Sequence, residues 1–96
     1  MKVFEIVAVY DNLTEAYLEP HFFGTLAEAQ RVFIHQINNI PLWKDNAGDY
    51  DLYSIGRFDM ETGVIMSDSP HKIMNGRAGL RREEYNDLQS AEQAES

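Results

Sequence analysis

Three aspartates lie close together in the segment DNAGDYD at residues 45–51, which superficially resembles a calcium-binding loop. Asp45, Asp49 and Asp51 carry the carboxylate oxygens that Ca²⁺ prefers. Such a loop needs a glutamate at its twelfth position, where this chain has Gly56, and its central glycine is displaced here. The segment is therefore interpreted as a solvated loop that leads into a strand, and no metal or other cofactor is expected.

The other residues with catalytic chemistry lack the spacing that catalysis requires. The histidines His21, His35 and His71 form no pair with the spacing of helical metal ligands. Ser54 and Ser67 lack the context of a nucleophile elbow, and the glycines are too scattered to hold a phosphate. The chain has no cysteine, which excludes a thiol nucleophile and a disulfide scaffold. The chain is therefore not expected to be an enzyme.

Aromatic residues on expected strands are the first candidates for binding chemistry. Tyr10, Tyr53 and Phe58 fall in strand-like segments, and Arg57 lies beside Phe58. Nucleic-acid-binding sheets use such rings as stacking platforms, each worth about 1–3 kcal/mol per base. The preferred interpretation is that these rings form the core of a small sheet, since aromatic residues favour buried strands.

A basic segment is the second candidate. The chain has 8 basic and 16 acidic residues and a net charge of −8. Residues 69–82 nevertheless contain four basic residues and no acidic one. Basic side chains can contact the phosphates of a flexible strand, although the neighbouring acidic segments could neutralise them within the molecule. The predicted nucleic-acid-binding set is Arg57, Lys72, Arg77, Arg81 and Arg82.

Hydrophobic periodicity predicts the elements that position these residues. Residues 2–10 read as a central strand with two apolar faces, and residues 15–18 as a short second strand. A helix is expected at 25–38, because Thr25 and Glu28 fit a capping box and apolar residues recur at helical spacing.

The second half of the chain predicts a hairpin. Residues 39–50 read as an irregular connector, and residues 51–58 as a strand with alternating faces. In the turn at residues 59–63, Asp59 is expected to accept an amide and Gly63 to adopt the left-handed conformation. Residues 64–67 are expected to return as a short strand.

These elements predict an α+β fold, with one helix packed on a small, mainly antiparallel sheet of three to four strands. The α+β domain is expected to span residues 1–68, followed by a basic connector and an acidic, disordered tail over residues 69–96. A weak helix could form at 80–91. No apolar run approaches the length of a membrane helix, so no membrane contact is expected.

Self-association is also expected, because a small sheet with one helix leaves a face and an edge uncovered. The loop around Leu42 and Trp43 could meet a second copy, unless Trp43 folds over its own sheet. The predicted protein interface is Leu42, Trp43 and Tyr53.

Three segments carry a family resemblance: VFEIVAVYDN, EAYLEPHFFGTLAEAQRVF and DYDLYSIGRFDMETGVI. In this order, over residues 1–67, they resemble the small non-structural protein of microviruses, the single-stranded DNA phages of the gokushovirus or chlamydia-phage group. Ile55 stands where leucine is common in that family. The resemblance implies a non-enzymatic phage protein of the host cytoplasm with an accessory role in genome replication, through single-stranded DNA contacts. The alternative is an acidic module that binds a viral or host protein without contacting DNA.

Overall fold

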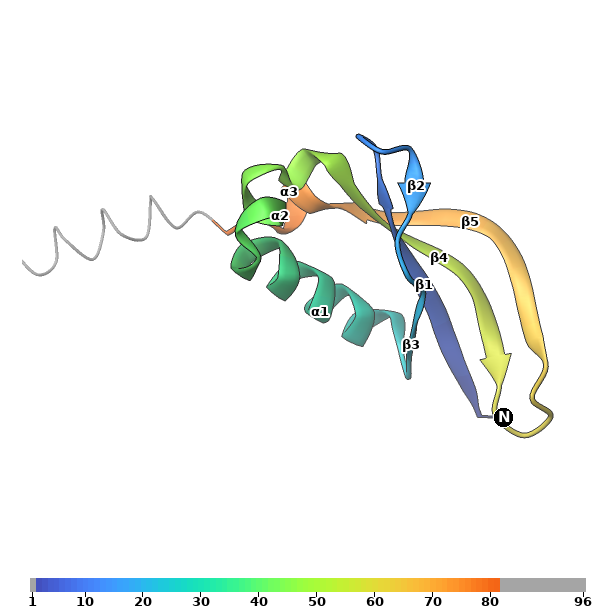
Figure 1. Ribbon diagram of the computed structural model, residues 1–96. Helices are drawn as coiled ribbons and strands as arrows, with labels where there is room; N and C mark the ends of the chain where they lie inside the picture. Colours follow the sequence, from blue (N-terminus) through green and yellow to red (C-terminus); the bar gives the residue numbers. More distant parts are fainter. Residues whose placement is uncertain (1, 82–96) are drawn as a thin grey trace, which may run out of the picture.

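A central strand with two apolar faces organises the fold of residues 2–81, which are the residues described by the computed structural model (Figure 1). Strand β1 (Val3–Asp11) pairs along one edge with both β2 (Ala16–Tyr17) and β3 (His21–Phe23). Along its other edge it pairs with β4 (Tyr50–Asp59), which in turn pairs with β5 (Ile65–Asn75). All pairings are antiparallel, so the predicted α+β class is confirmed, with five strands instead of three to four.

Helix α1 (Leu26–Asn39), the longest helix within residues 2–81, begins where the sequence predicts it. The Thr25 hydroxyl accepts a hydrogen bond from the Glu28 amide at 3.1 Å, which satisfies one of the free amides of the first turn. The helix ends before Ile40, and Pro41 opens the short helix α2 (Pro41–Asp45). The expected irregular connector is therefore partly helical, because it contains α2 and the 3₁₀ turn η1 (Ala47–Asp49).

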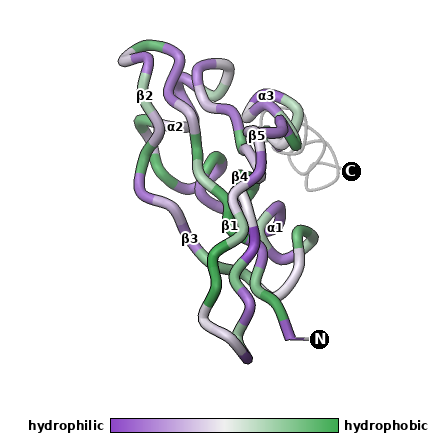
Figure 2. Tube along the Cα trace, turned by 90° about the vertical axis from the view of Figure 1, so that its right-hand side faces the viewer, coloured by the Kyte–Doolittle hydropathy of each residue, from purple (hydrophilic) through white to green (hydrophobic). Residues whose placement is uncertain are grey.

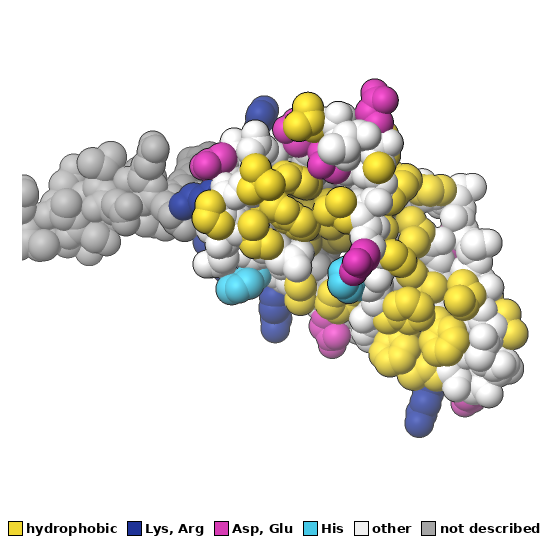
Figure 3. Space-filling view, viewed as in Figure 1, with side chains coloured by type: hydrophobic (Ala, Val, Ile, Leu, Met, Phe, Trp, Pro, Cys, Tyr) yellow, Lys and Arg dark blue, Asp and Glu magenta, His cyan; other side chains and the backbone are white. Residues whose placement is uncertain are grey.

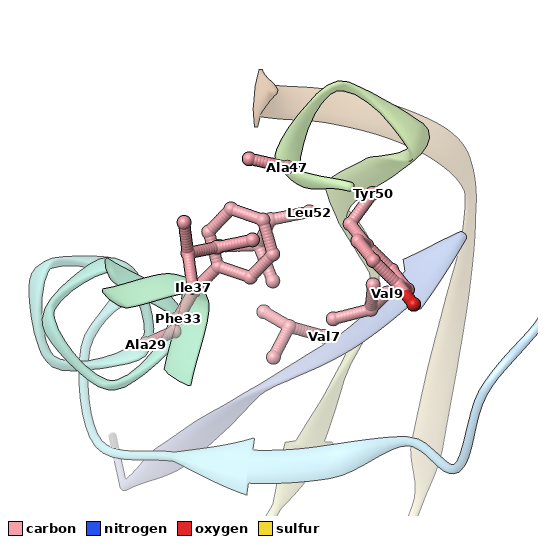
Figure 4. Close-up of a cluster of buried hydrophobic side chains, with 8 residues drawn as sticks. All are labelled: Val7, Val9, Ala29, Phe33, Ile37, Ala47, Tyr50 and Leu52. Carbon is pink, nitrogen blue, oxygen red and sulfur yellow. The ribbon is translucent and has the colours of Figure 1, made fainter. Parts of the chain in front are cut away.

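The core lies between α1 and one face of the sheet. Ala29, Phe33 and Ile37 project from α1 at helical spacing toward the sheet (Figure 4). They meet Val7 and Val9 of β1, together with side chains from η1 and β4. Hydrophobic residues follow β1 through the middle of the sheet (Figure 2), as the two-faced pattern of this strand predicts.

The turn between β4 and β5 confirms the predicted hairpin chemistry. The Asp59 carboxylate accepts hydrogen bonds from the amides of Glu61 and Thr62 at 2.8 and 3.3 Å. These amides lower the pKa of Asp59 below its ordinary value, with the Glu61 amide as the main cause. Gly63 has φ of 75°, the left-handed conformation that this position requires.

The expected alternation along β4 is wrong beyond Ser54, because the pairing register shifts there. Ser54 pairs with Val7, whereas Gly56 pairs with Ile6, so Ile55 has no partner on β1. One extra residue moves all following side chains to the opposite face. Phe58 therefore lies on the same face as Tyr53, although simple alternation placed them on opposite faces.

Strand β5 is longer than predicted. The expected strand at 64–67 continues to Asn75, and Gly76–Gly79 form the short helix α3. Pro70 is compatible with this strand because the register between β4 and β5 shifts there, and residues 68–70 have no partner on β4. Residues 69–79 of the expected connector thus belong to the folded sheet and helix. Arg82, most of the expected helix at 80–91 and the tail at 83–96 lie outside the described residues.

Gly76 allows α3 to pack tightly against the core, which gives a stability prediction. A Cβ atom at this position would clash with the Ala47 carbonyl and lie 2.6 Å from Cδ1 of Ile37. Gly76→Ala is therefore expected to lower the free energy of unfolding by about 1–3 kcal/mol in urea titrations. Gly24→Ala is the matched control, since its Cβ would meet only the Glu28 carboxylate at 3.5 Å. Equal stability of the two variants would contradict the close approach of α3.

Candidate nucleic-acid interface

The face of the sheet opposite α1 carries two groups of aromatic rings. Register places Phe4, Ile6, Ala8 and Tyr10 on this face of β1, together with their partners on the neighbouring strands. We name the two groups by their chemistry. The tyrosine cluster comprises Tyr10, Tyr17 and Tyr53, and the phenylalanine cluster comprises Phe4, Phe22 and Phe58.

The tyrosine cluster joins three strands. Tyr17 of β2 lies edge-on to Tyr10 of β1 and Tyr53 of β4, with ring centroids 4.8 and 5.6 Å apart. Rings from the two flanking strands thus meet across β1, where Ala8 is small enough to be buried beneath them. Tyr17 is nevertheless 45% exposed. Burial and then the neighbouring rings of Tyr53 and Tyr10 raise its pKa, so its hydroxyl stays neutral at physiological pH.

The phenylalanine cluster repeats this arrangement at the other end of β1. Phe22 of β3 contacts Phe4 and Phe58 edge-on, with centroids 6.4 and 5.6 Å apart. Phe22 is 45% exposed, whereas Ile6 beneath the rings is buried. Figure 3 shows hydrophobic side chains gathered over this end of the sheet, which extends beyond α1 in Figure 1. Both clusters therefore cover β1 and also present ring surface to the outside.

A buried carboxylate lies at the margin of the tyrosine cluster. The Asp51 side chain accepts hydrogen bonds from Asn12 and Asn75, both at 2.8 Å, and pairs with the Lys72 ammonium at 3.2 Å. Burial alone would raise the pKa of Asp51, but the amides and Lys72 outweigh it and lower the pKa below its ordinary value. Lys72 pairs in register with Tyr53, so its half-exposed side chain lies on the face of the tyrosine cluster.

The structure spreads the other predicted basic residues over the molecule. Arg57 pairs in register with Glu5, on the opposite face from the rings, and lies 3.9 Å from the Asp68 carboxylate. Arg77 lies on α3. The backbone amide of Arg81 donates a hydrogen bond to the Asn38 side chain of α1. Of the described candidates, only Lys72 lies beside a ring cluster.

Arg77 borders a polar hollow between α2, η1 and α3. Lys44, which sequence reasoning did not select, lines the same hollow. Asp45 and Asp49 also line it, so the two cations face two carboxylates. This balance disfavours a phosphate at this place, because the carboxylates repel the same anion that the cations attract.

The predicted protein interface does not form one surface. Trp43 stacks on Tyr50, with centroids 4.6 Å apart and an interplanar angle of 15°, and packs against the core. Leu42 is exposed on α2, whereas Tyr53 lies in the tyrosine cluster on the other face of the sheet. Trp43 thus folds over its own sheet, which is the alternative that the sequence analysis left open.

Sequence reasoning missed three rings of this face: Phe4, Tyr17 and Phe22. The signal was present in part, because Phe4 and Tyr10 alternate correctly along β1. The position of Phe22 could not be predicted, because β3 has only three residues and lies between Pro20 and Gly24. A segment this short shows no clear hydrophobic period. Only pairing with β1 places it above the sheet.

Two further observations concern residues 2–81 alone. No three histidine or carboxylate side chains in this part of the chain come together as a metal site. No helix in it is both long and apolar enough to cross a membrane.

Comparison with known proteins gives one match. The family described as Phage ORF5 protein matches residues 4–78, which include nearly all of the sheet, α1 and both ring clusters. No curated protein and no solved structure matches the chain.

Proposed function

Because the chain belongs to the Phage ORF5 protein family, we propose that it is a non-enzymatic, non-structural protein of a microvirus-type phage. In this proposal it assists replication of the single-stranded DNA genome in the host cytoplasm by contacting single-stranded DNA. The observation that carries the proposal is the tyrosine cluster, where the half-exposed ring of Tyr17 contacts Tyr53, and Tyr53 pairs in register with Lys72.

Ring stacking suits single strands. A flexible strand can place successive bases against Tyr17, since every base has a π face and stacking needs no particular sequence. The neutral phenol of Tyr17 adds a hydrogen-bond donor and acceptor at the edge of the ring. Lys72 supplies a positive charge near the same face, although Asp51 partly neutralises it.

The net charge of the chain argues for a short, weak contact. A protein with net charge −8 repels a long phosphate backbone, so extended duplex DNA is a poor ligand. Binding should therefore depend on stacking more than on phosphate contacts, and it should still weaken as salt is added.

The test is binding of a fluorescent single-stranded oligonucleotide at low and physiological salt. Tyr17→Ala is expected to weaken binding by about 1–3 kcal/mol, which is roughly fivefold to 150-fold, and Tyr17→Phe is expected to retain most of the affinity. Leu13→Ala is the control, because Leu13 is exposed in the nearby β1–β2 turn. Absence of binding by the parent at low salt would reject direct DNA contact.

A protein-binding role is the second candidate. The exposed apolar side chains at the turn between β4 and β5, together with the acidic composition, favour a viral or host protein as the partner. An apolar contact is not weakened by added salt, whereas a phosphate contact is, so salt dependence separates the two functions.

A further inference from the structure

We propose that the phenylalanine cluster is the interface through which two copies of this chain associate. Register extends the cluster into an apolar band across four strands, because Phe58 pairs with Phe4 on one side and with Ile65 on the other. Phe22 completes the band from β3. Ile65 is 62% exposed, and Val64 and Met60 of the adjoining turn are exposed beside it.

Within residues 2–81, this end of the sheet has no second layer. The core residues of α1 pack on Val7 and Val9 on one face of the sheet, whereas the band lies on the opposite face, at the Phe4 end of β1. A sheet with an apolar face is stable when another layer buries that face. Two sheets can pack face to face through such surfaces, with their side chains interleaved.

The chemistry of the band favours a second copy over a nucleic acid. Phenylalanine, isoleucine and valine side chains offer no hydrogen-bond donor to a phosphate, and Arg57 lies on the opposite face, near Asp68. Lys2 and Glu61 are both exposed at this end of the sheet, where the Met60 amide donates to the Lys2 carbonyl. In a dimer with a two-fold axis, Lys2 of each copy can lie against Glu61 of the other copy, so the patch is complementary to itself.

The overall charge sets the expected salt dependence. Two chains that each carry a net charge of −8 repel one another, and added salt screens this repulsion. Dimerisation through the apolar band should therefore strengthen with salt. Binding to DNA phosphates should change in the opposite direction.

Sedimentation of the full chain over a range of concentrations, at low and high salt, tests the interface. The parent is expected to form a dimer that is favoured by salt. Ile65→Asp is expected to weaken the dimer by about tenfold or more, because it places a charge in an apolar interface. Leu42→Asp is the matched control, since Leu42 is 64% exposed on α2, and it is expected to leave the dimer unchanged.

Two results would overturn the proposal: a parent that stays monomeric at all concentrations, or a dimer that Leu42→Asp disrupts and Ile65→Asp does not. A parent that stays monomeric would indicate that the apolar band binds a different protein. Val64→Asp, at an exposed position next to β5, provides a second disruptive variant if Ile65→Asp fails to fold. Sedimentation of the parent and of Tyr17→Ala requires no DNA. Its result therefore tests the dimer interface independently of the proposed DNA contact.

Discussion

Truncation of Phe33 to alanine is expected to lower the free energy of unfolding by about 3–5 kcal/mol. Phe33 is 1% exposed and lies between α1 and the sheet, against Val7 and Leu52 (Figure 4). Removing its ring forfeits the burial of the ring and leaves a cavity, because neighbours held by β1 and β4 can only partly close it. Domains of this size are stable by about 5–15 kcal/mol, so the loss is a large share of the total.

Val32→Ala is the matched control for this prediction. Val32 is the preceding residue of α1 but is 39% exposed, so its truncation is expected to change stability by no more than about 0.5 kcal/mol. Urea denaturation of both variants measures the difference. Similar losses for Phe33→Ala and Val32→Ala would contradict the position of the core.

The sequence predicts the elements that are fixed by local chemistry. The capping hydroxyl of Thr25, the turn carboxylate of Asp59 and the left-handed glycine at position 63 each act within a few residues of themselves. Their patterns therefore identify α1 and the β4–β5 turn directly, to within a residue or two. The two apolar faces of β1 likewise predict that it is central.

Features that depend on pairing between distant residues could not be predicted. The extra residue at Ile55 becomes visible only when β4 is aligned with β1, and it is this residue that brings Phe58 onto the face of Tyr53. The length of β5 is similarly hidden, because Pro70 and its polar neighbours read as a loop, and the pairing of His71 and Lys72 with β4 becomes visible only when the two strands are aligned.

The candidate site shows the same division. Aromatic residues on strands are recognisable, so the sequence identifies Tyr10, Tyr53 and Phe58 as candidates, and they do share one face. The expectation that they form the core is wrong, because the core lies between α1 and the other face of the sheet. Their partners Tyr17 and Phe22 come from two very short strands that pair with the same edge of β1. The basic residues looked like one group because they are close in sequence, but Lys72 lies on β5 and pairs with Asp51, whereas Arg77 lies on α3 and lines the polar hollow.

Replacement of Asp51 by asparagine is expected to cost about 2–3 kcal/mol near neutral pH. The Asp51 carboxylate accepts hydrogen bonds from the side-chain amides of Asn12 and Asn75. The Asn12 side-chain amide also donates to the Asp49 carbonyl, and that of Asn75 donates to the Gly48 carbonyl. One carboxylate thus ties the β1–β2 turn and the end of β5 to the start of β4. An asparagine at this position has only one acceptor oxygen. Either Asn12 or Asn75 would therefore face the NH₂ group of the new side chain and lose its hydrogen-bond acceptor.

The pH dependence of this loss distinguishes the carboxylate from a merely well-packed side chain. The folded pKa of Asp51 lies below the value of about 3.9 that an aspartate has in an unfolded chain. Its stabilising contribution is therefore complete above that value and disappears as the pH falls through the folded pKa. Asp59, whose pKa is also lowered, contributes equally in the parent and in Asp51→Asn, so the difference between their unfolding curves isolates Asp51. Urea titrations from neutral pH down to strongly acidic pH should show this difference shrinking below about pH 4. A difference that stayed constant over that range would mean that Asp51 stabilises the fold by its shape, without its charge.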